Sequence, residues 1–94
     1  NIYFVMKHLT LIIRGKVQGV FFRASTKEKA QALGITGTVR NQPDGCVLVE
    51  AEGSEEQLEQ FVQWCHRGPA HARVDEVIIN EGEPQKFAGF KVIH

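Results

Sequence analysis

The segment 15–23, GKVQGVFFR, constrains the fold most, because it joins a predicted strand directly to a predicted helix. An alternating apolar run at 9–13 precedes this segment and indicates a strand. A run of helix formers follows it and ends at Leu33 and Gly34. The chain must therefore turn from strand to helix within a few residues. Gly15 and Gly19 lie in this turn, and glycine readily adopts the positive φ that a tight turn needs.

A turn of this kind has the physical properties of an anion site. The first N–H groups of a helix have no partner within the helix, and the positive end of the helix dipole lies behind them. Phosphate is a common ligand at such a position. Arg23, in the first helical turn, could add two parallel hydrogen bonds to phosphate oxygens. The local pattern leaves two interpretations open, since such glycines often serve only the turn and such an arginine is often only solvated.

Two ordered motifs resemble the signatures of the acylphosphatase family. The first is 13–23, IRGKVQGVFFR, and the second is 37–41, GTVRN, followed at the family's spacing by Gly45, Val47 and Gly53. The resemblance covers about residues 7–94, and two motifs in order are far more specific than one. Thr38 departs from the pattern, because the family usually carries an aromatic residue there.

This resemblance implies an enzyme that hydrolyses acyl phosphates to a carboxylate and inorganic phosphate, without a metal or another cofactor. It implies Arg23 and Asn41 as the catalytic residues. A small-molecule acyl phosphate is the expected partner, and a phosphate or sulfate ion is expected to bind in the loop. The predicted phosphate-binding residues are Gln18, Gly19, Val20, Phe21, Phe22 and Arg23.

The residue types in the two motifs agree with this reaction. Neither motif contains Asp, Glu, His, Ser or Cys, so the motifs offer a phosphate binder and the neutral amide of Asn41. Positioning and electrostatic stabilisation are most of what phosphoryl transfer needs, and Asn41 could orient a water for in-line attack. Without an acid to protonate it, the leaving group must be a good one, such as a carboxylate with a conjugate-acid pKa of about 4. A substrate oxygen would then take the proton of the water. Taken alone, Asn41 before a turn is also typical of turn chemistry.

The periodicity predicts strands at 7–14, 35–41, 46–52, 73–80 and 90–93 and a helix at 22–33 capped by Gly34. A second helix begins at Ser54, which forms a capping box with Gln57, and ends before Gly68. This order predicts an α+β, ferredoxin-like βαββαβ sandwich, with an antiparallel sheet of four to five strands and two helices on one face. In that topology the third strand lies between the first and the second. The loop at 15–23 and Asn41 then lie at the same edge of the sheet. The axes of their two strands are separated by two strand spacings, about 10 Å.

Composition excludes several other classes of protein. Ninety-four residues predict a single domain, 1–94, and the start-like pair Met6 and Lys7 predicts that 1–5 are appended to it or disordered. Eleven basic and eleven acidic residues disfavour binding to nucleic acid or membranes, and the apolar run 2–6 is too short for a signal or a membrane span. Cys65, His66 and His71 lack zinc-site spacing, so no metal site is predicted. A cytoplasmic monomer is expected.

Two other function classes fit a ferredoxin-like sheet. An RNA-binding module would stack bases on aromatic residues of its central strands, but the strand at 46–52 has no aromatic residue and two acidic ones. A stronger alternative is a non-catalytic regulatory module that binds an acyl or carbamoyl phosphate. Binding needs only the loop and Arg23, so the presence of Asn41 favours the enzyme.

Overall fold

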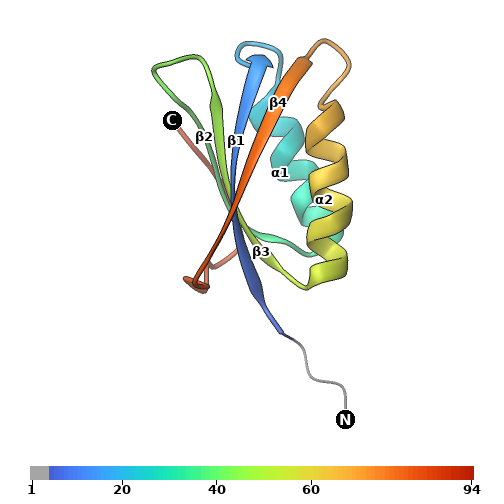
Figure 1. Ribbon diagram of the computed structural model, residues 1–94, viewed down its shortest axis with the longest axis vertical. Helices are drawn as coiled ribbons and strands as arrows, with labels where there is room; N and C mark the ends of the chain where they lie inside the picture. The colour runs from blue at the N-terminus through green and yellow to red at the C-terminus, as the bar shows by residue number, and fades with distance from the viewer. Residues whose placement is uncertain (1–4) are drawn as a thin grey trace.

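A computed structural model describes residues 5–94 as five strands and two helices (Figure 1). Apart from Val5, which is exposed, the predicted appended segment 1–5 lies outside the described residues. The elements, in chain order, are β1 (Lys7–Lys16), α1 (Phe22–Leu33), β2 (Thr36–Asn41), β3 (Val47–Gly53), α2 (Glu55–Arg67), β4 (Arg73–Gly82) and β5 (Phe90–Ile93).

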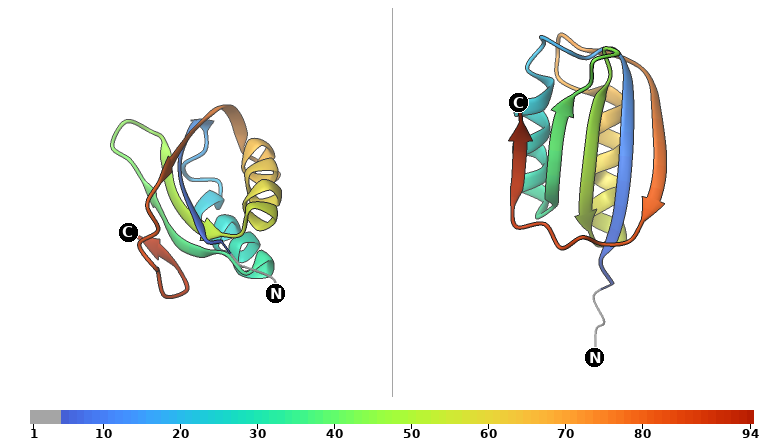
Figure 2. Two further views of the ribbon diagram at one scale, coloured as in Figure 1. Left: turned by 60° about the horizontal axis from the view of Figure 1, so that its bottom comes forward. Right: turned by 90° about the vertical axis from the view of Figure 1, so that its left-hand side faces the viewer.

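The strands form one sheet in the order β4-β1-β3-β2-β5, and both helices cover the same face of it (Figure 2). Strands β1 and β2 each pair antiparallel with β3, so they run parallel to one another. The predicted ferredoxin-like sandwich is confirmed. The sheet is mixed rather than purely antiparallel, because the connection after β4 crosses the end of the sheet and brings β5 back parallel to β2.

Alternation along the central strands builds the core between the sheet and the helices. Leu11 and Ile13 of β1 and Val49 of β3 are fully buried on the face toward the helices. Phe22 of α1 and Phe61 of α2 pack against this face. Each such side chain stabilises the fold by about 1.5–3 kcal/mol relative to an exposed one, so the core holds the strand ends in fixed relative positions.

The local helix signals act as predicted. The Ser54 hydroxyl accepts a hydrogen bond from the Gln57 N–H at 3.2 Å, and the Gln57 side chain accepts one from the Ser54 N–H at 2.8 Å. This confirms the capping box at the start of α2. Gly34 ends α1 with φ +76°, the left-handed conformation that glycine adopts at little cost.

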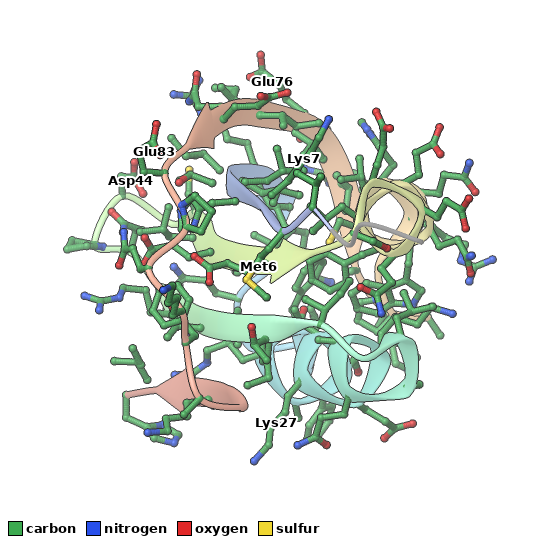
Figure 3. The ribbon with its side chains drawn as sticks, turned by 90° about the horizontal axis from the view of Figure 1, so that it is seen from below. Met6, Lys7, Lys27, Asp44, Glu76 and Glu83 are labelled. Atoms are coloured by element: carbon green, nitrogen blue, oxygen red, sulfur yellow. The ribbon has the colours of Figure 1, made fainter. Side chains whose placement is uncertain are left out.

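Charged side chains surround the fold. Seen along the sheet, Lys27, Glu76 and Glu83 project away from the ribbon (Figure 3). In the part of the chain that the structure describes, neither helix is long and apolar enough to cross a membrane.

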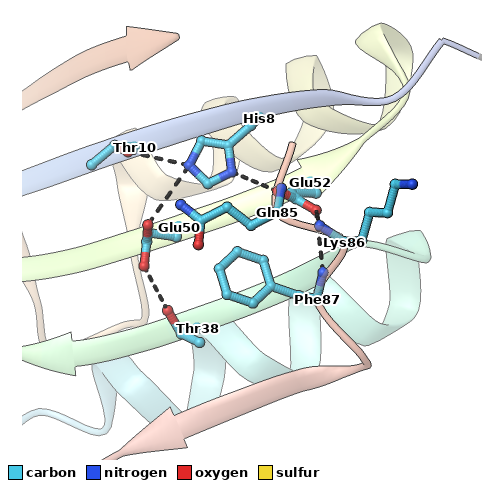
Figure 4. Close-up of polar contacts among 8 residues, drawn as sticks. All are labelled: His8, Thr10, Thr38, Glu50, Glu52, Gln85, Lys86 and Phe87. Carbon is cyan, nitrogen blue, oxygen red and sulfur yellow. Dashed lines mark hydrogen bonds and ion pairs between the residues drawn. The ribbon is translucent and has the colours of Figure 1, made fainter. Parts of the chain in front are cut away.

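The sheet face away from the helices contains one buried carboxylate, that of Glu52 (Figure 4). It accepts hydrogen bonds from the main-chain N–H groups of Gln85, Lys86 and Phe87, in the connection between β4 and β5. It also accepts one from His8 Nδ1 at 2.7 Å, and because an ionised carboxylate only accepts, that nitrogen carries the proton. Glu52 thus ties the connection between β4 and β5 to the centre of the sheet.

These contacts also set the charge state of Glu52. Burial is the largest single influence and raises the pKa of this carboxyl, but the bonds from Gln85, His8, Phe87 and Lys86 together lower the pKa below its ordinary value of 4.5. The carboxylate is therefore ionised at neutral pH. Because its folded pKa is depressed, its contribution to stability is full above pH 4.5 and is lost as the pH falls through the folded pKa.

We expect Glu52→Gln to lower the free energy of unfolding at pH 7 by about 2–3 kcal/mol, because hydrogen bonds to a charged acceptor are lost. The glutamine NH2 group would also face main-chain donors. Denaturant unfolding at pH 7 and at pH 3 measures the effect, and the gap from wild type should narrow at the lower pH, because below pH 4.5 the unfolded chain binds a proton at Glu52 and wild type loses stability. Glu28→Gln, on the exposed side of α1, is the matched control and should change stability by less than about 0.5 kcal/mol. Equal stability of Glu52→Gln and wild type at pH 7 would contradict this account.

Candidate active site

Three segments that are distant in sequence meet at one end of the sheet. They are the loop between β1 and α1, the end of β2 and the end of β5 (Figure 2). Together they enclose a pocket of about 430 Å³, and both predicted catalytic residues lie in its wall. The lining residues are Val17, Gly19, Phe21, Phe22, Arg23, Ala24, Asn41, Val92 and His94.

The loop is shorter than the predicted segment 15–23. Strand β1 continues to Lys16, with a register shift against β4 between Arg14 and Gly15. A Cβ atom at Gly15 would lie 2.1 Å from the carbonyl oxygen of Arg73. Gly15 is therefore required by the close approach of two strands, and its assignment to the phosphate loop was wrong. The loop itself comprises residues 17–21.

The loop backbone presents polar groups to open space. Gly19 and Phe21 have φ values of +74° and +62°, so the chain reverses through two left-handed residues. A Cβ atom at Gly19 would meet nothing within 4 Å, and Gly19 lines the pocket. Within residues 5–94, the N–H groups of Gly19, Val20 and Phe21 donate to no other group. These donors stand beside the start of α1, where the helix dipole adds positive potential.

Side chains that alternate along the loop hold it in place. Val20 and Phe22 are buried in the core, and Phe22 packs against Trp64 with ring centroids 5.7 Å apart. Phe21, between them, is 80% exposed at the rim of the pocket. Val20 was predicted to bind phosphate, but its side chain does not line the pocket, which leaves its main-chain N–H for that role.

Gln18 does not line the pocket, and its side chain binds the turn between β2 and β3. Its side-chain Nε2 donates to the carbonyl oxygen of Gln42 at 2.8 Å and to that of Cys46 at 2.9 Å. A side-chain amide has two hydrogens, so both are used. The side chain of Gln18 has no donor left for an anion, and only its main-chain N–H remains available for the predicted phosphate contact.

Arg23 lies half-buried in the first turn of α1. Its Nη1 donates to the carbonyl oxygen of Ile93 at 3.3 Å and lies 3.5 Å from His94 Nδ1. A guanidinium also carries N–H groups on Nε and Nη2, and these remain for an anion in the pocket. The first turn of α1 contains no acidic residue that would neutralise this charge.

Asn41 is the last residue of β2 and forms part of the pocket wall. Its Oδ1 is buried and accepts no hydrogen bond from any group within residues 5–94. Leaving a buried acceptor unsatisfied costs about 1–3 kcal/mol, so most such atoms in proteins are paired. Asn41 therefore lines the pocket with an unused hydrogen-bond acceptor in its side chain.

Val92 and His94 complete the pocket and were not predicted from the sequence. No local motif marks them; only the parallel pairing of β5 with β2 brings them beside Asn41. Arg23 and His94 have titratable side chains in the pocket wall, and none of the described residues that line it is Asp or Glu. Among residues 5–94, no three His, Cys, Asp or Glu side chains are grouped to hold a metal ion.

Comparisons with known proteins agree on one family. The Acylphosphatase family model matches residues 9–92. An acylphosphatase from Marinobacter nauticus is 52% identical over 85 residues, which are 89% of this chain and 92% of that protein. The structure of an acylphosphatase from Coxiella burnetii superposes with a TM-score of 0.90 at 34% identity, covering 94% of this chain and 93% of that chain.

A similar fold also occurs inside a much larger protein. Full-length HypF, solved in a phosphate- and nucleotide-bound form, matches with a TM-score of 0.89 at 26% identity. The match covers 99% of this chain but 12% of that chain. The same fold is therefore found both as a small chain and as part of a longer one.

Proposed function

This chain belongs to the acylphosphatase family of acyl-phosphate hydrolases, and we propose a mechanism in which Arg23 and Asn41 are its catalytic residues. The reaction cleaves the carboxyl–phosphate bond to release a carboxylate and inorganic phosphate. The observation that carries the proposal is that Arg23 and Asn41, whose Oδ1 is buried and unpaired, both line one pocket.

In this mechanism the loop and the start of α1 hold the phosphate group. The free N–H groups of Gly19, Val20 and Phe21 and the N–H groups of Arg23 donate to its non-bridging oxygens. These donors are fixed before the substrate arrives, since Val20 and Phe22 anchor the loop in the core. Preorganised donors stabilise the charge that spreads over these oxygens in the transition state.

Asn41 orients the attacking water. Its Oδ1 accepts one hydrogen bond from that water, whose oxygen attacks phosphorus in line with the departing carboxylate. The P–O bond to the acyl group breaks, and its electron pair leaves with the carboxylate. The proton of the water passes to a phosphate oxygen. A carboxylate leaves without protonation, because its conjugate acid has a pKa of about 4, and this matches a pocket wall without a carboxylic acid.

We further propose that the reaction needs no metal. Metal ions that assist phosphoryl transfer prefer oxygen ligands, and the pocket wall offers none from Asp or Glu. We also propose a monomer that works in the cytoplasm. The two cysteines, Cys46 and Cys65, are buried and unpaired, as is usual in a reducing compartment.

A non-catalytic module that binds an acyl or carbamoyl phosphate is the second candidate. The similarity to one part of HypF favours it, because that protein shows the fold within a larger chain. Such a module needs the loop and Arg23 to bind its ligand but does not need Asn41. The buried, unpaired Oδ1 of Asn41 therefore favours the hydrolase.

For Asn41→Ala we expect kcat for benzoyl phosphate to fall by orders of magnitude while the inhibition constant of inorganic phosphate barely changes. The reason is that Asn41 acts on the water and not on the phosphate. Steady-state kinetics with phosphate as a competitive inhibitor measures both quantities, and Asn80→Ala, an exposed asparagine on β4, is the control. Weakened phosphate binding with a near-normal kcat would assign Asn41 to binding instead.

Arg23→Lys should keep the positive charge but lose the planar fork that makes two parallel bonds to phosphate. We expect kcat/KM to fall by an amount equivalent to about 2–4 kcal/mol, the scale of one preorganised donor at a developing oxyanion. Phosphate affinity should fall less, and the melting temperature without phosphate should shift little. Arg67→Lys at the exposed end of α2 is the matched control. Near-wild-type turnover in Arg23→Lys would mean that the loop N–H groups suffice.

EDTA should leave the rate of benzoyl phosphate hydrolysis unchanged, because no step of the proposed mechanism uses a metal. The measurement is phosphate release by metal-depleted protein with and without added Mg²⁺. Loss of activity on chelation, restored by a divalent ion, would overturn the metal-free mechanism.

A further inference from the structure

We propose that Gln18 is a positioning residue that fixes Asn41 relative to the phosphate loop. Gln18 belongs to the loop between β1 and α1, and its side-chain amide binds the turn between β2 and β3. The inference rests on the proposed role of Asn41, which directly precedes that turn. It replaces the expectation that the side chain of Gln18 contacts phosphate.

The two carbonyl groups that Gln18 binds lie where the turn leaves β2 and where it enters β3. Gln42 follows Asn41, Cys46 precedes β3, and the Gln42 N–H donates to the Cys46 carbonyl at 2.8 Å. Gln18 Nε2 reaches both carbonyl oxygens, at 2.8 and 2.9 Å. The turn is also braced internally, because Asp44 Oδ1 accepts from the Cys46 N–H at 3.0 Å. Gln18 therefore binds a turn, residues 42–46, that is held by its own hydrogen bonds.

The sheet does not supply this connection. Strand β3 separates β1 from β2, so those two strands share no ladder hydrogen bonds; each pairs with β3 on one side and with β4 or β5 on the other. The ladder between β2 and β3 reaches its last pair at Asn41 and Val47. Beyond that pair, one bond from Gln18 joins the loop directly to Gln42, the residue after Asn41, and the other joins it to Cys46, the residue before β3.

The bonds from Gln18 affect catalysis by fixing the distance between Asn41 and the phosphate loop. The proposed mechanism needs the water on Asn41 in line with a phosphate held by the loop, and a misplacement of about 1 Å can cost about 100-fold in rate. The loop keeps its own donors when Gln18 is changed, since the main-chain N–H groups remain. Loss of the amide should therefore reduce kcat while phosphate binding persists.

The test compares Gln18→Met with wild type. Methionine has nearly the same length but no N–H group, so both bonds are lost without a large change in volume. We expect kcat for benzoyl phosphate to fall by about 10- to 100-fold, with the inhibition constant of inorganic phosphate changed by less than about threefold. Gln31→Met, on the exposed side of α1, is the matched control and should keep wild-type kinetics.

A double-mutant cycle separates positioning from a general structural effect. If Gln18 acts through Asn41, Gln18→Met should cause almost no further loss of kcat in the Asn41→Ala background. An equal loss in both backgrounds would overturn the inference. So would a loss of phosphate affinity that matches the loss of kcat, because it would place the side chain on the phosphate.

A second variant keeps the inference testable if Gln18→Met does not fold. Gln18→Asn retains the amide but is one methylene shorter and cannot reach both carbonyl oxygens, so it should show the same selective loss of kcat. Wild-type kcat in a folded variant would overturn the role of Gln18 alone, provided that Asn41→Ala is impaired. Wild-type turnover in Asn41→Ala would instead overturn the proposed mechanism, and the Gln18 inference with it.

Discussion

The pocket depends on the pairing of β3 with two partners at once. Because β3 runs antiparallel to both β1 and β2, those two strands run parallel and end at the same edge of the sheet. The loop that leads to Arg23 in α1 follows one of them, and Asn41 ends the other. A register shift of one residue would turn every core side chain of these strands to the opposite face, so burial of Leu11 and Val49 fixes the alignment. Hydrophobic packing thus determines where two polar groups meet.

The third wall of the pocket has a different origin. Strand β5 lies at the edge of the sheet and is reached by a connection that crosses its far end. The carboxylate of Glu52 holds that connection through three main-chain N–H groups and also accepts a hydrogen bond from His8 of β1 (Figure 4). At its other end, β5 presents the Ile93 carbonyl to Arg23. Glu52 therefore holds the connection that leads into β5 at one end of the sheet, and Arg23 binds the last residue of β5 at the other end.

Much of the fold could be predicted from the sequence, because its signals are local. The capping box at Ser54, the glycine after α1 and the order of the elements each depend on residues close in the chain. Features that depend on distant partners were missed or misread. Gly15 was predicted in the loop but lies in β1 against Arg73, and no local signal predicts the two bonds from the Gln18 side chain to the turn after β2. The resemblance to a family predicted Arg23 and Asn41 as catalytic residues, whereas no local sequence signal predicts His94 in the pocket wall.

The spacing of the pocket walls along the chain has a consequence for biosynthesis. The lining residues come from positions 17–24, from Asn41 and from Val92 and His94. Contacts between segments so far apart are costly in entropy, because each requires the closure of a long stretch of chain. A ribosome-bound chain that ends before β5 would have its loop and Asn41 but not the third wall that holds Arg23. The pocket is thus complete only when β5 has joined the sheet.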